Sequence, residues 1–334
     1  MKILFAGSPA IAVPSLLALS EMECAEPPGK SNIRLAGILT NQDSPQGRKS
    51  ALVPTEVSLA AAALSRERVE KGFAPIAQLK FNKLGSQARG QAASLECDLL
   101  VCFAYGRFFG PKFLSLFPMG GINIHPSLLP RFRGPSPIAA AILSGDRETG
   151  ISIQTIAAEM DAGLLLGQEK IPLSGRETSA SLNETAALKS AQMLKSLIPA
   201  MAGGLIQPQP QIGEPVYCKM IAKEDGRLDW SQSASKIDAM VRAYNPWPLC
   251  YTSWKEENIF FYEGRVFDKA APVKDKPPHG IPGSVLGMER DYGILIQTGD
   301  GVYAVSRIQR QAKKAMDWKA FLNGTQDFIG SVLG

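Results

Sequence analysis

Two apolar runs decide the fold class of the N-terminal half: CDLLVCFAYG, residues 97–106, and GINIHPSLLP, residues 121–130. Each is a short, almost unbroken apolar stretch that gives way to glycine, proline or polar side chains at its end. A strand that is apolar on both sides is typical of a parallel sheet, because helices cover both faces and exclude water. The two runs therefore predict buried strands of an α/β domain.

Further runs of this kind alternate with helical patterns along the same half. Apolar runs at 2–7, 33–40 and 150–163 predict additional strands of the sheet. The stretches at 12–22 and 57–72 have the composition and length of helices. This order predicts a doubly wound α/β domain, in which ligands bind at the carboxyl ends of the strands.

The C-terminal part has a different pattern. A helical stretch over 177–204 ends in two glycines, which is a helix-stop signal. We expect a first domain over 1–205, a proline-rich linker over 206–216 and a second domain over 217–334. Short alternating apolar stretches with frequent Gly and Pro predict that the second domain is small, all-β and barrel-like.

The composition is that of an ordinary globular protein. Of 334 residues, 45% are apolar and 20% are charged, which allows a sizeable core and argues against disorder. The net charge is only +5, so any nucleic-acid surface would be local. Five cysteines without a CxxC pair and two histidines do not form a metal-ligand cluster of the usual spacing. We therefore expect no bound metal.

Residues 1–19 combine one lysine with an apolar stretch, as a signal peptide would. However, Gly7, Pro9 and Pro14 interrupt the stretch, so a strand followed by a helix fits better. No apolar run reaches the length needed to span a membrane. We expect a cytoplasmic protein.

Asn123, His125 and Asp161 are the strongest candidate site. In an extended segment alternate side chains share a face, so Asn123 and His125 point the same way. A carboxylate beside an imidazole would raise its pKa and fix its orientation. The set lacks a nucleophile, which suits stabilising an oxyanion while a substrate's own nucleophile attacks a carbonyl. The alternative is a loop histidine that caps a strand, with an unrelated surface aspartate.

Two basic stretches are candidates for binding nucleic acid. Arg48 and Lys49 lie in a polar loop after the second expected strand. Within eight residues near the C-terminus, four cations occur without an acid between them: Arg307, Arg310, Lys313 and Lys314. On pattern alone, each stretch is better explained as a solvated loop or edge strand. No dinucleotide or P-loop fingerprint occurs in the chain.

The segment that contains the candidate site resembles the signature of the folate-dependent formyltransferases. That family has Asn-x-His-x-Ser-Leu-Leu-Pro, then Arg-Gly, Gly-Asp-x-x-Thr-Gly and Met-Asp-x-Gly. The matching positions are Asn123, His125, Ser127–Pro130, Arg133, Gly134, Gly145, Asp146, Thr149, Gly150 and Met160–Gly163. Stretches outside this segment resemble the branch of the family that formylates methionyl-tRNA, namely FAGSP at 5–9, AYG at 104–106, GRLDW at 226–230, RAYNPWP at 242–248 and KKAM at 313–316.

The resemblance implies a Rossmann-like N-terminal domain and an OB-like C-terminal barrel. It implies that 10-formyltetrahydrofolate donates a formyl group to the α-amine of methionine on initiator tRNA, by direct attack of that amine. Such an enzyme acts in translation initiation. We expect it to work as a monomer.

The resemblance also implies roles for individual residues. Asn123 and His125 would polarise the formyl oxygen, and Asp161 would orient His125 and accept or relay the amine proton. The folate pocket would be lined by Tyr105, Gly106, Arg107, Phe109, Ser127, Leu128, Leu129 and Pro130. Arg48 matches a basic loop that, in the family, reaches the tRNA acceptor end. From the charge pattern we further expect the four C-terminal cations to form a second anchor for tRNA, opposite Arg48 and Lys49.

One departure concerns the folate pocket. Leu165 and Leu166 stand where the family has an Asp-Thr pair, so we expect a more apolar slot than in relatives.

Two alternatives remain open at this point. A formyltransferase acting on an amino sugar or glycinamide ribonucleotide would have the same three residues, although the second domain and the NPWP segment argue against it. The second alternative is a tRNA- or nucleotide-binding module that kept the fold but lost the catalytic activity. The presence of Asn123, His125 and Asp161 together argues against it.

Overall fold

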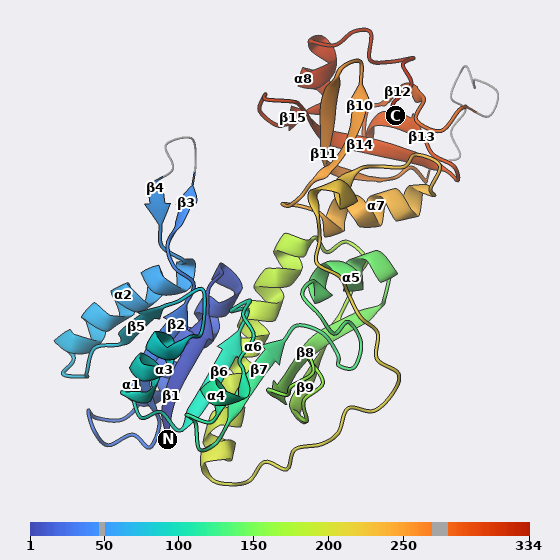
Figure 1. Ribbon diagram of the computed structural model, residues 1–334. Coiled ribbons are helices and arrows are strands. Elements are labelled where there is room, and N and C mark those ends of the chain that lie inside the picture. Colours follow the sequence, from blue (N-terminus) through green and yellow to red (C-terminus); the bar gives the residue numbers. More distant parts are fainter. Residues whose placement is uncertain (47–50, 269–279) are drawn as a thin grey trace. The chain divides into compact units, whose positions relative to one another are not determined.

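The computed structural model describes residues 1–46, 51–268 and 280–334 (Figure 1). The chain divides into two compact units, each formed by segments that are separated in the sequence. The first unit contains Met1–Pro137, Glu148–Pro172 and Asn183–Lys219, and the second contains Ile138–Arg147, Leu173–Leu182 and Met220–Gly334.

The first unit is built on a seven-stranded sheet with the order β5-β2-β1-β6-β7-β8-β9. The strands are β1 (Lys2–Gly7), β2 (Arg34–Thr40), β5 (Ala77–Lys80), β6 (Leu99–Phe103), β7 (Gly121–His125), β8 (Glu148–Thr155) and β9 (Leu165–Pro172). A separate hairpin consists of β3 (Ser44–Gln46) and β4 (Ala51–Val53). The strands from β5 to β7 are parallel, whereas β8 and β9 are antiparallel to their neighbours.

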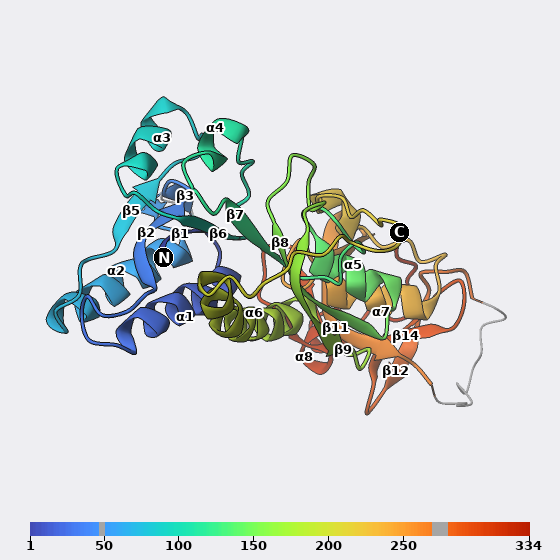
Figure 2. The same ribbon diagram turned by 90° about the horizontal axis from the view of Figure 1, so that it is seen from below.

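Helices cover both faces of this sheet. They are α1 (Val13–Cys24), α2 (Glu56–Glu70), α3 (Ser86–Ala93), α4 (Pro111–Leu114) and α6 (Ser179–Ala202), with a 3-10 turn η1 (Ala10–Ala12) before α1. Figure 2 shows α1, α2 and α6 on one face and α3 and α4 on the other. The predicted doubly wound α/β fold is confirmed.

One expectation about the sheet was wrong. The run at 150–163 was predicted as another strand of a parallel sheet, but β8 pairs antiparallel with both neighbours. Antiparallel strands are tolerated at the edge of a mixed sheet, where one side is open to solvent. The burial shows where this edge lies: β9 has exposed positions, whereas β8, between β7 and β9, is buried at six of its eight positions.

Four aromatic side chains, which we call the aromatic file, pack against the sheet on the side covered by α3 and α4. The ring centroids of Tyr105, Phe109, Phe113 and Phe117 follow one another at 5.5, 5.6 and 5.8 Å. All four side chains are buried and belong to one apolar cluster with residues of β1, β2 and β6. Burial of these four rings stabilises the unit chiefly by the hydrophobic effect, and the contacts between the rings add a smaller contribution.

The strand order places a topological switch point between β1 and β6. From β1 the chain adds β2 and β5 on one side, then crosses to add β6 and β7 on the other. Crevices at the carboxyl ends of such strands are the usual ligand sites of doubly wound sheets. A site is therefore expected at the carboxyl ends of β1 and β6, next to that of β7, which pairs with β6.

The second unit contains an antiparallel sheet with the order β10-β11-β14-β13-β12, and β15 pairs with β14. The strands are β10 (Cys250–Trp254), β11 (Glu257–Val266), β12 (Val285–Glu289), β13 (Gly293–Gln297), β14 (Val302–Arg310) and β15 (Met316–Asp317). Its helices are α5 (Pro137–Ser144), α7 (Ala234–Ala243) and α8 (Trp318–Asn323), with a 3-10 turn η2 (Lys223–Gly226). The small antiparallel β domain is confirmed, whereas its closure into an OB-like barrel stays a prediction, because the pairings among described residues leave β10 and β12 as separate edges.

Candidate functional site

Strand β7 presents Asn123 and His125 at its carboxyl end. Ile122 and Ile124, which alternate with them, are 1% and 2% exposed, as the period of two predicts. Asn123 is half-buried and His125 is only 4% exposed. His125 is therefore a buried residue of the strand itself, not a loop histidine that caps it.

The chain after β7 folds back and is held by hydrogen bonds to β8 and β9. Ser152 Oγ donates to Ser127 O at 2.6 Å and accepts from Leu129 N at 3.0 Å. Gln168 Nε2 donates to Leu129 O at 2.8 Å, and Ser127 Oγ donates to Arg131 O at 2.5 Å. Because these hydrogen bonds pair the buried polar groups of the loop after β7, they hold this loop in a fixed position.

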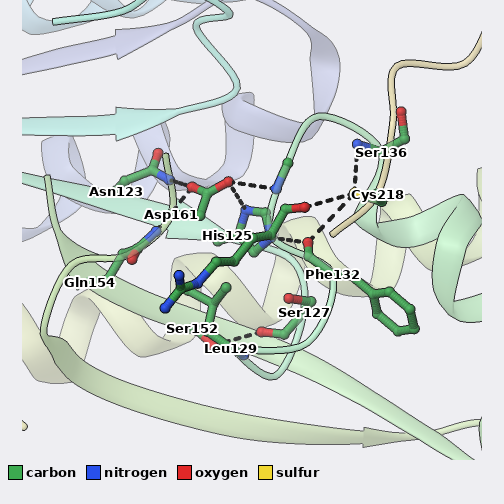
Figure 3. Close-up of polar contacts among 12 residues, drawn as sticks. Asn123, His125, Ser127, Leu129, Phe132, Ser136, Ser152, Gln154, Asp161 and Cys218 are labelled. Atoms are coloured by element: carbon green, nitrogen blue, oxygen red, sulfur yellow. Dashed lines mark hydrogen bonds and ion pairs between the residues drawn. The ribbon is translucent and has the colours of Figure 1, made fainter. Parts of the chain in front are cut away.

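The carboxylate of Asp161 is the point at which the other groups converge (Figure 3). Its Oδ1 accepts from Asn123 Nδ2 at 3.3 Å and from Gln154 Nε2 at 3.0 Å. Its Oδ2 accepts from Gly134 N at 2.9 Å and lies 3.6 Å from His125 Nδ1. The structure thus brings together the three residues that the sequence analysis singled out, and it adds Gln154 and a backbone amide.

The two ring nitrogens of His125 face different oxygens. Nε2 lies 2.8 Å from Phe132 O, and because a carbonyl only accepts, Nε2 carries a proton. Burial lowers the pKa of His125, while the Asp161 carboxylate and the Phe132 carbonyl act in the opposite direction. In the neutral ring, the unprotonated Nδ1 faces Asp161 Oδ2, so the pair has room for one additional proton between them.

Two residues of the site have strained backbones. Phe132 and Asp161 have φ angles of 56° and 54°, in the left-handed region that favours glycine. The loop after Asp161 also approaches β8 very closely, because a Cβ on Gly163 would lie 1.7 Å from Thr155 O. Strain of this kind persists only where surrounding contacts hold it.

The residues expected to line the folate pocket fall into two groups. Tyr105 and Phe109 are buried in the aromatic file, and Tyr105 Oη donates to Phe81 O at 2.6 Å. Gly106 and Arg107 are exposed, and so is Phe108, at 63%. The side chains of Arg107 and Phe108 therefore face solvent there, and of these two the sequence analysis did not select Phe108. In the second segment Ser127, Leu129 and Pro130 are buried and Leu128 is half-buried.

The basic residues are only partly within the described chain. Arg48 and Lys49 lie outside the described residues. On β14, Arg310 pairs with Glu257 and Arg307 lies 4.0 Å from Glu263. The remaining two cations of that stretch, Lys313 and Lys314, are exposed in the turn after β14.

Two glutamines near Asp161 were not found from the sequence. Gln154 is 1% exposed and lies on β8, where a polar residue in an apolar run was an available signal. Gln211 donates to the backbone oxygens of Asp161 and Gly163, at 2.8 and 2.9 Å. Nothing in its proline-rich surroundings distinguishes it in the sequence.

Within residues 1–46, 51–268 and 280–334, no group of three or more His, Cys, Asp or Glu side chains could hold a metal ion. The helices of the same residues include none that is long and apolar enough to cross a membrane.

Two family models match almost the whole chain. The formyl transferase model matches residues 2–198, and the formyl transferase C-terminal domain model matches residues 220–326. This chain belongs to the formyl transferase family. A methionyl-tRNA formyltransferase of Treponema denticola is 44% identical to it over 330 residues, which cover 98% of both chains.

Solved structures of low identity share its fold. HypX from Aquifex aeolicus in complex with tetrahydrofolic acid has a TM-score of 0.58 at 16% identity, covering 98% of this chain. This chain spans about half of HypX, 48% of its length. An N-formyltransferase from Helicobacter canadensis, solved with folinic acid and dTDP-3-aminofucose, has a TM-score of 0.60 at 14% identity over 91% of this chain and 99% of its own. The family expected from the sequence, and with it a formyl-transferring enzyme, is confirmed.

Proposed function

We propose that this chain transfers the formyl group of 10-formyltetrahydrofolate to the α-amine of methionine on initiator tRNA. One observation carries the proposal: a buried carboxylate, an amide and an imidazole converge at the carboxyl end of β7, with no nucleophilic side chain among them. Such a set serves a reaction in which the substrate brings its own nucleophile. The likeness to methionyl-tRNA formyltransferases over nearly the full length supports this amine as the acceptor.

The reaction requires a donor for the oxyanion and an acceptor for a proton. Asn123 Nδ2 has two N–H groups, of which one donates to Asp161, so the second is available for the formyl oxygen. As the amine nitrogen attacks the formyl carbon, its proton has a place between Asp161 Oδ2 and His125 Nδ1, 3.6 Å apart. The bond from the formyl carbon to N10 of the folate then breaks, and N10 takes a proton, which restores the site.

The folate would bind at the neighbouring strand end. The exposed residues Gly106 to Phe108 lie in the turn after β6 and offer backbone groups and one aromatic face, which suit a flat heterocycle. Ser127, Leu129 and Pro130 would shape this site from within rather than contact the ligand with exposed surface. Leu165 and Leu166, which are half-buried at the start of β9, remain candidates for an apolar wall.

We also propose a cytoplasmic monomer that binds tRNA partly through its second domain. All groups around Asp161 come from one chain, so no second copy is needed to complete the site. Lys313 and Lys314 are exposed and suited to phosphate contacts, which position a tRNA without reading its sequence.

The test is formyl transfer from 10-formyltetrahydrofolate to three acceptors: methionyl initiator tRNA, an amino-sugar nucleotide and glycinamide ribonucleotide. We expect N-formylmethionine on the tRNA and little product from the two small amines. Uncharged tRNA, which lacks the amine, is the control for hydrolysis of the donor. Preferential formylation of either small amine would replace this proposal with the alternative acceptor class.

A further inference from the structure

The segment that joins the two family-model regions runs along the edge of the candidate site. We call residues 206–219 the connecting segment; they belong to the first unit. Gln209 and Leu165 exchange two backbone hydrogen bonds, of 2.7 and 2.8 Å, at the start of β9. Further on, Arg133 N donates to Val216 O at 2.8 Å and Cys218 N donates to Arg133 O at 2.8 Å. The connecting segment is therefore fastened to both loops that flank Asp161.

Gln211 is the half-buried side chain in the middle of this segment, and Ile206 and Cys218 are half-buried near its ends. From residue 207 to residue 217 every residue is exposed except Gln211, which is half-buried. Its Nε2 donates to Gln154 Oε1 at 3.1 Å, in addition to the carbonyls of Asp161 and Gly163 at 2.8 and 2.9 Å. Its Oε1 accepts from Arg133 Nε at 3.1 Å and Nη2 at 2.8 Å. A side chain with all its hydrogen-bonding groups occupied is held in one orientation.

These contacts act on Asp161 by two routes. The first is direct, since Gln211 binds the carbonyl of a residue whose backbone has an unfavourable positive φ of 54°. The second runs through Gln154, whose Oε1 accepts from both Gln211 and Gly163 N. With its oxygen taken, Gln154 must turn its NH2 group toward Asp161 Oδ1, 3.0 Å away.

We propose that Gln211 is a positioning residue of the formyl transfer reaction, holding the Asp161 carboxylate in place through its backbone and through Gln154. The inference rests on the proposed function, because that function gives the Asp161 carboxylate its role in the reaction. The contacts of Gln211 with Asp161 and Gln154 are the same whichever amine is formylated. Through Gln211, and not through its other side chains, the connecting segment then helps to position the Asp161 carboxylate.

Gln211→Ala and Gln209→Ala form a matched pair for the test. Both lie in the connecting segment, but the side chain of Gln209 is exposed and donates to Gln207 O at 3.4 Å, away from Asp161. Gln211→Ala should lower kcat by about tenfold or more, as is usual when a partner that orients a functional group is lost, with both KM values nearly unchanged. Gln209→Ala should match the parent.

A third variant separates positioning from simple packing. Gln211→Glu keeps the size of the side chain and an oxygen for Arg133, but it loses every donated hydrogen bond. Its second oxygen would face three acceptors, at Gln154, Asp161 and Gly163, so kcat should fall at least as far as in Gln211→Ala. A packing role would instead be restored by this isosteric change, and restoration would overturn the proposal.

Gln154→Ala completes a double-mutant cycle. Because Gln211 acts partly through Gln154, the double variant should lose less activity than the product of the two single losses. Losses that multiply independently would show that the two glutamines do not share a route to Asp161.

A measurement without turnover distinguishes failure of this inference from failure of the proposed function. The chain has only two histidines, so labelled imidazole carbons give two NMR signals, and His125→Gln assigns the one from His125. Displacement of the Asp161 carboxylate should lower the pKa of His125 in Gln211→Ala but not in Gln209→Ala. An unchanged His125 titration in Gln211→Ala overturns the inference whatever the acceptor proves to be.

Discussion

The carboxylate of Asp161 and the arginines of β14 differ in how their charges are stabilised. Asp161 is largely buried, and four groups from three segments, namely β7, the loop after it and β8, approach its two oxygens. Arg307 and Arg310 are solvent-accessible, and each has a single glutamate partner on β11. A buried charge depends on the position of every group around it, whereas water screens and replaces exposed pairs. Substitutions at Asp161 should therefore be far more consequential than substitutions on β14.

The largest effect is expected for Asp161→Asn. The amide retains the shape of the side chain but turns one donor toward groups that are themselves donors, and it removes the proton acceptor. Turnover should fall by about a hundredfold or more, the range for a lost acid–base or electrostatic group. The control is Glu148→Gln on β8, an equivalent change at an exposed carboxylate that pairs with Lys170. Near-normal turnover in Asp161→Asn would remove this residue from the mechanism.

Gly163→Ala should disturb the site without touching a charge. The new Cβ would lie 1.7 Å from Thr155 O, so the loop that carries Asp161 must move away from β8. We expect a loss of about 1–3 kcal/mol in the free energy of unfolding, as for other overpacked sites, and reduced turnover. In the control Gly167→Ala, the nearest atom to a new Cβ is Met193 Cε, at 3.8 Å. Equal stability and turnover in the two variants would show that this close approach is not needed.

Acid should destabilise the first unit through His125. Burial lowers the pKa of His125 below the ordinary histidine value of about 6.5, so under mildly acidic conditions the unfolded chain binds a proton that the native state does not. The contribution of His125 to stability is therefore complete above about pH 6.5 and declines as the pH falls toward the native pKa. The slope for one proton is at most about 1.4 kcal/mol per pH unit.

Denaturant titrations of the parent and of His125→Gln between pH 7.5 and pH 5.5 test this sign. The parent should lose more stability on acidification than the variant, because the variant lacks the group. A parent that gained stability relative to the variant at low pH would mean that the attraction of Asp161 outweighs burial.

The smallest effects are expected in the second unit. Replacing Lys313 and Lys314 by alanine should raise the KM for tRNA and reduce its salt dependence by about one unit of slope per lost phosphate contact. Turnover at saturating tRNA should hardly change. Arg310→Ala should alter the slope less than either lysine, because Glu257 already neutralises this arginine. Identical salt slopes in the parent and the double lysine variant would reduce the patch to a solvated surface.

The elements of the first unit were predictable because the signals are local. Unbroken apolar runs marked β1, β6 and β7, and a period of two placed Asn123 and His125 on one face. The direction of β8 was not predictable in this way, since pairing depends on how the chain returns to the sheet. The apolar pattern of 150–155 is compatible with either direction.

The sequence by itself determined the alternation of buried strands and helices, the change to a small β domain and the three candidate residues of the site, to which the resemblance to a family gave roles. Only the tertiary structure decided how Asp161 is held. Gln154, Gly134 and Gln211 reach this residue from β8, the loop after β7 and the connecting segment. No sequence period or motif connects these three residues, because hydrogen bonds between distant segments depend on which segments the tertiary fold brings together. Local sequence preferences specify the helices and strands, whereas the tertiary fold specifies which polar groups come into contact.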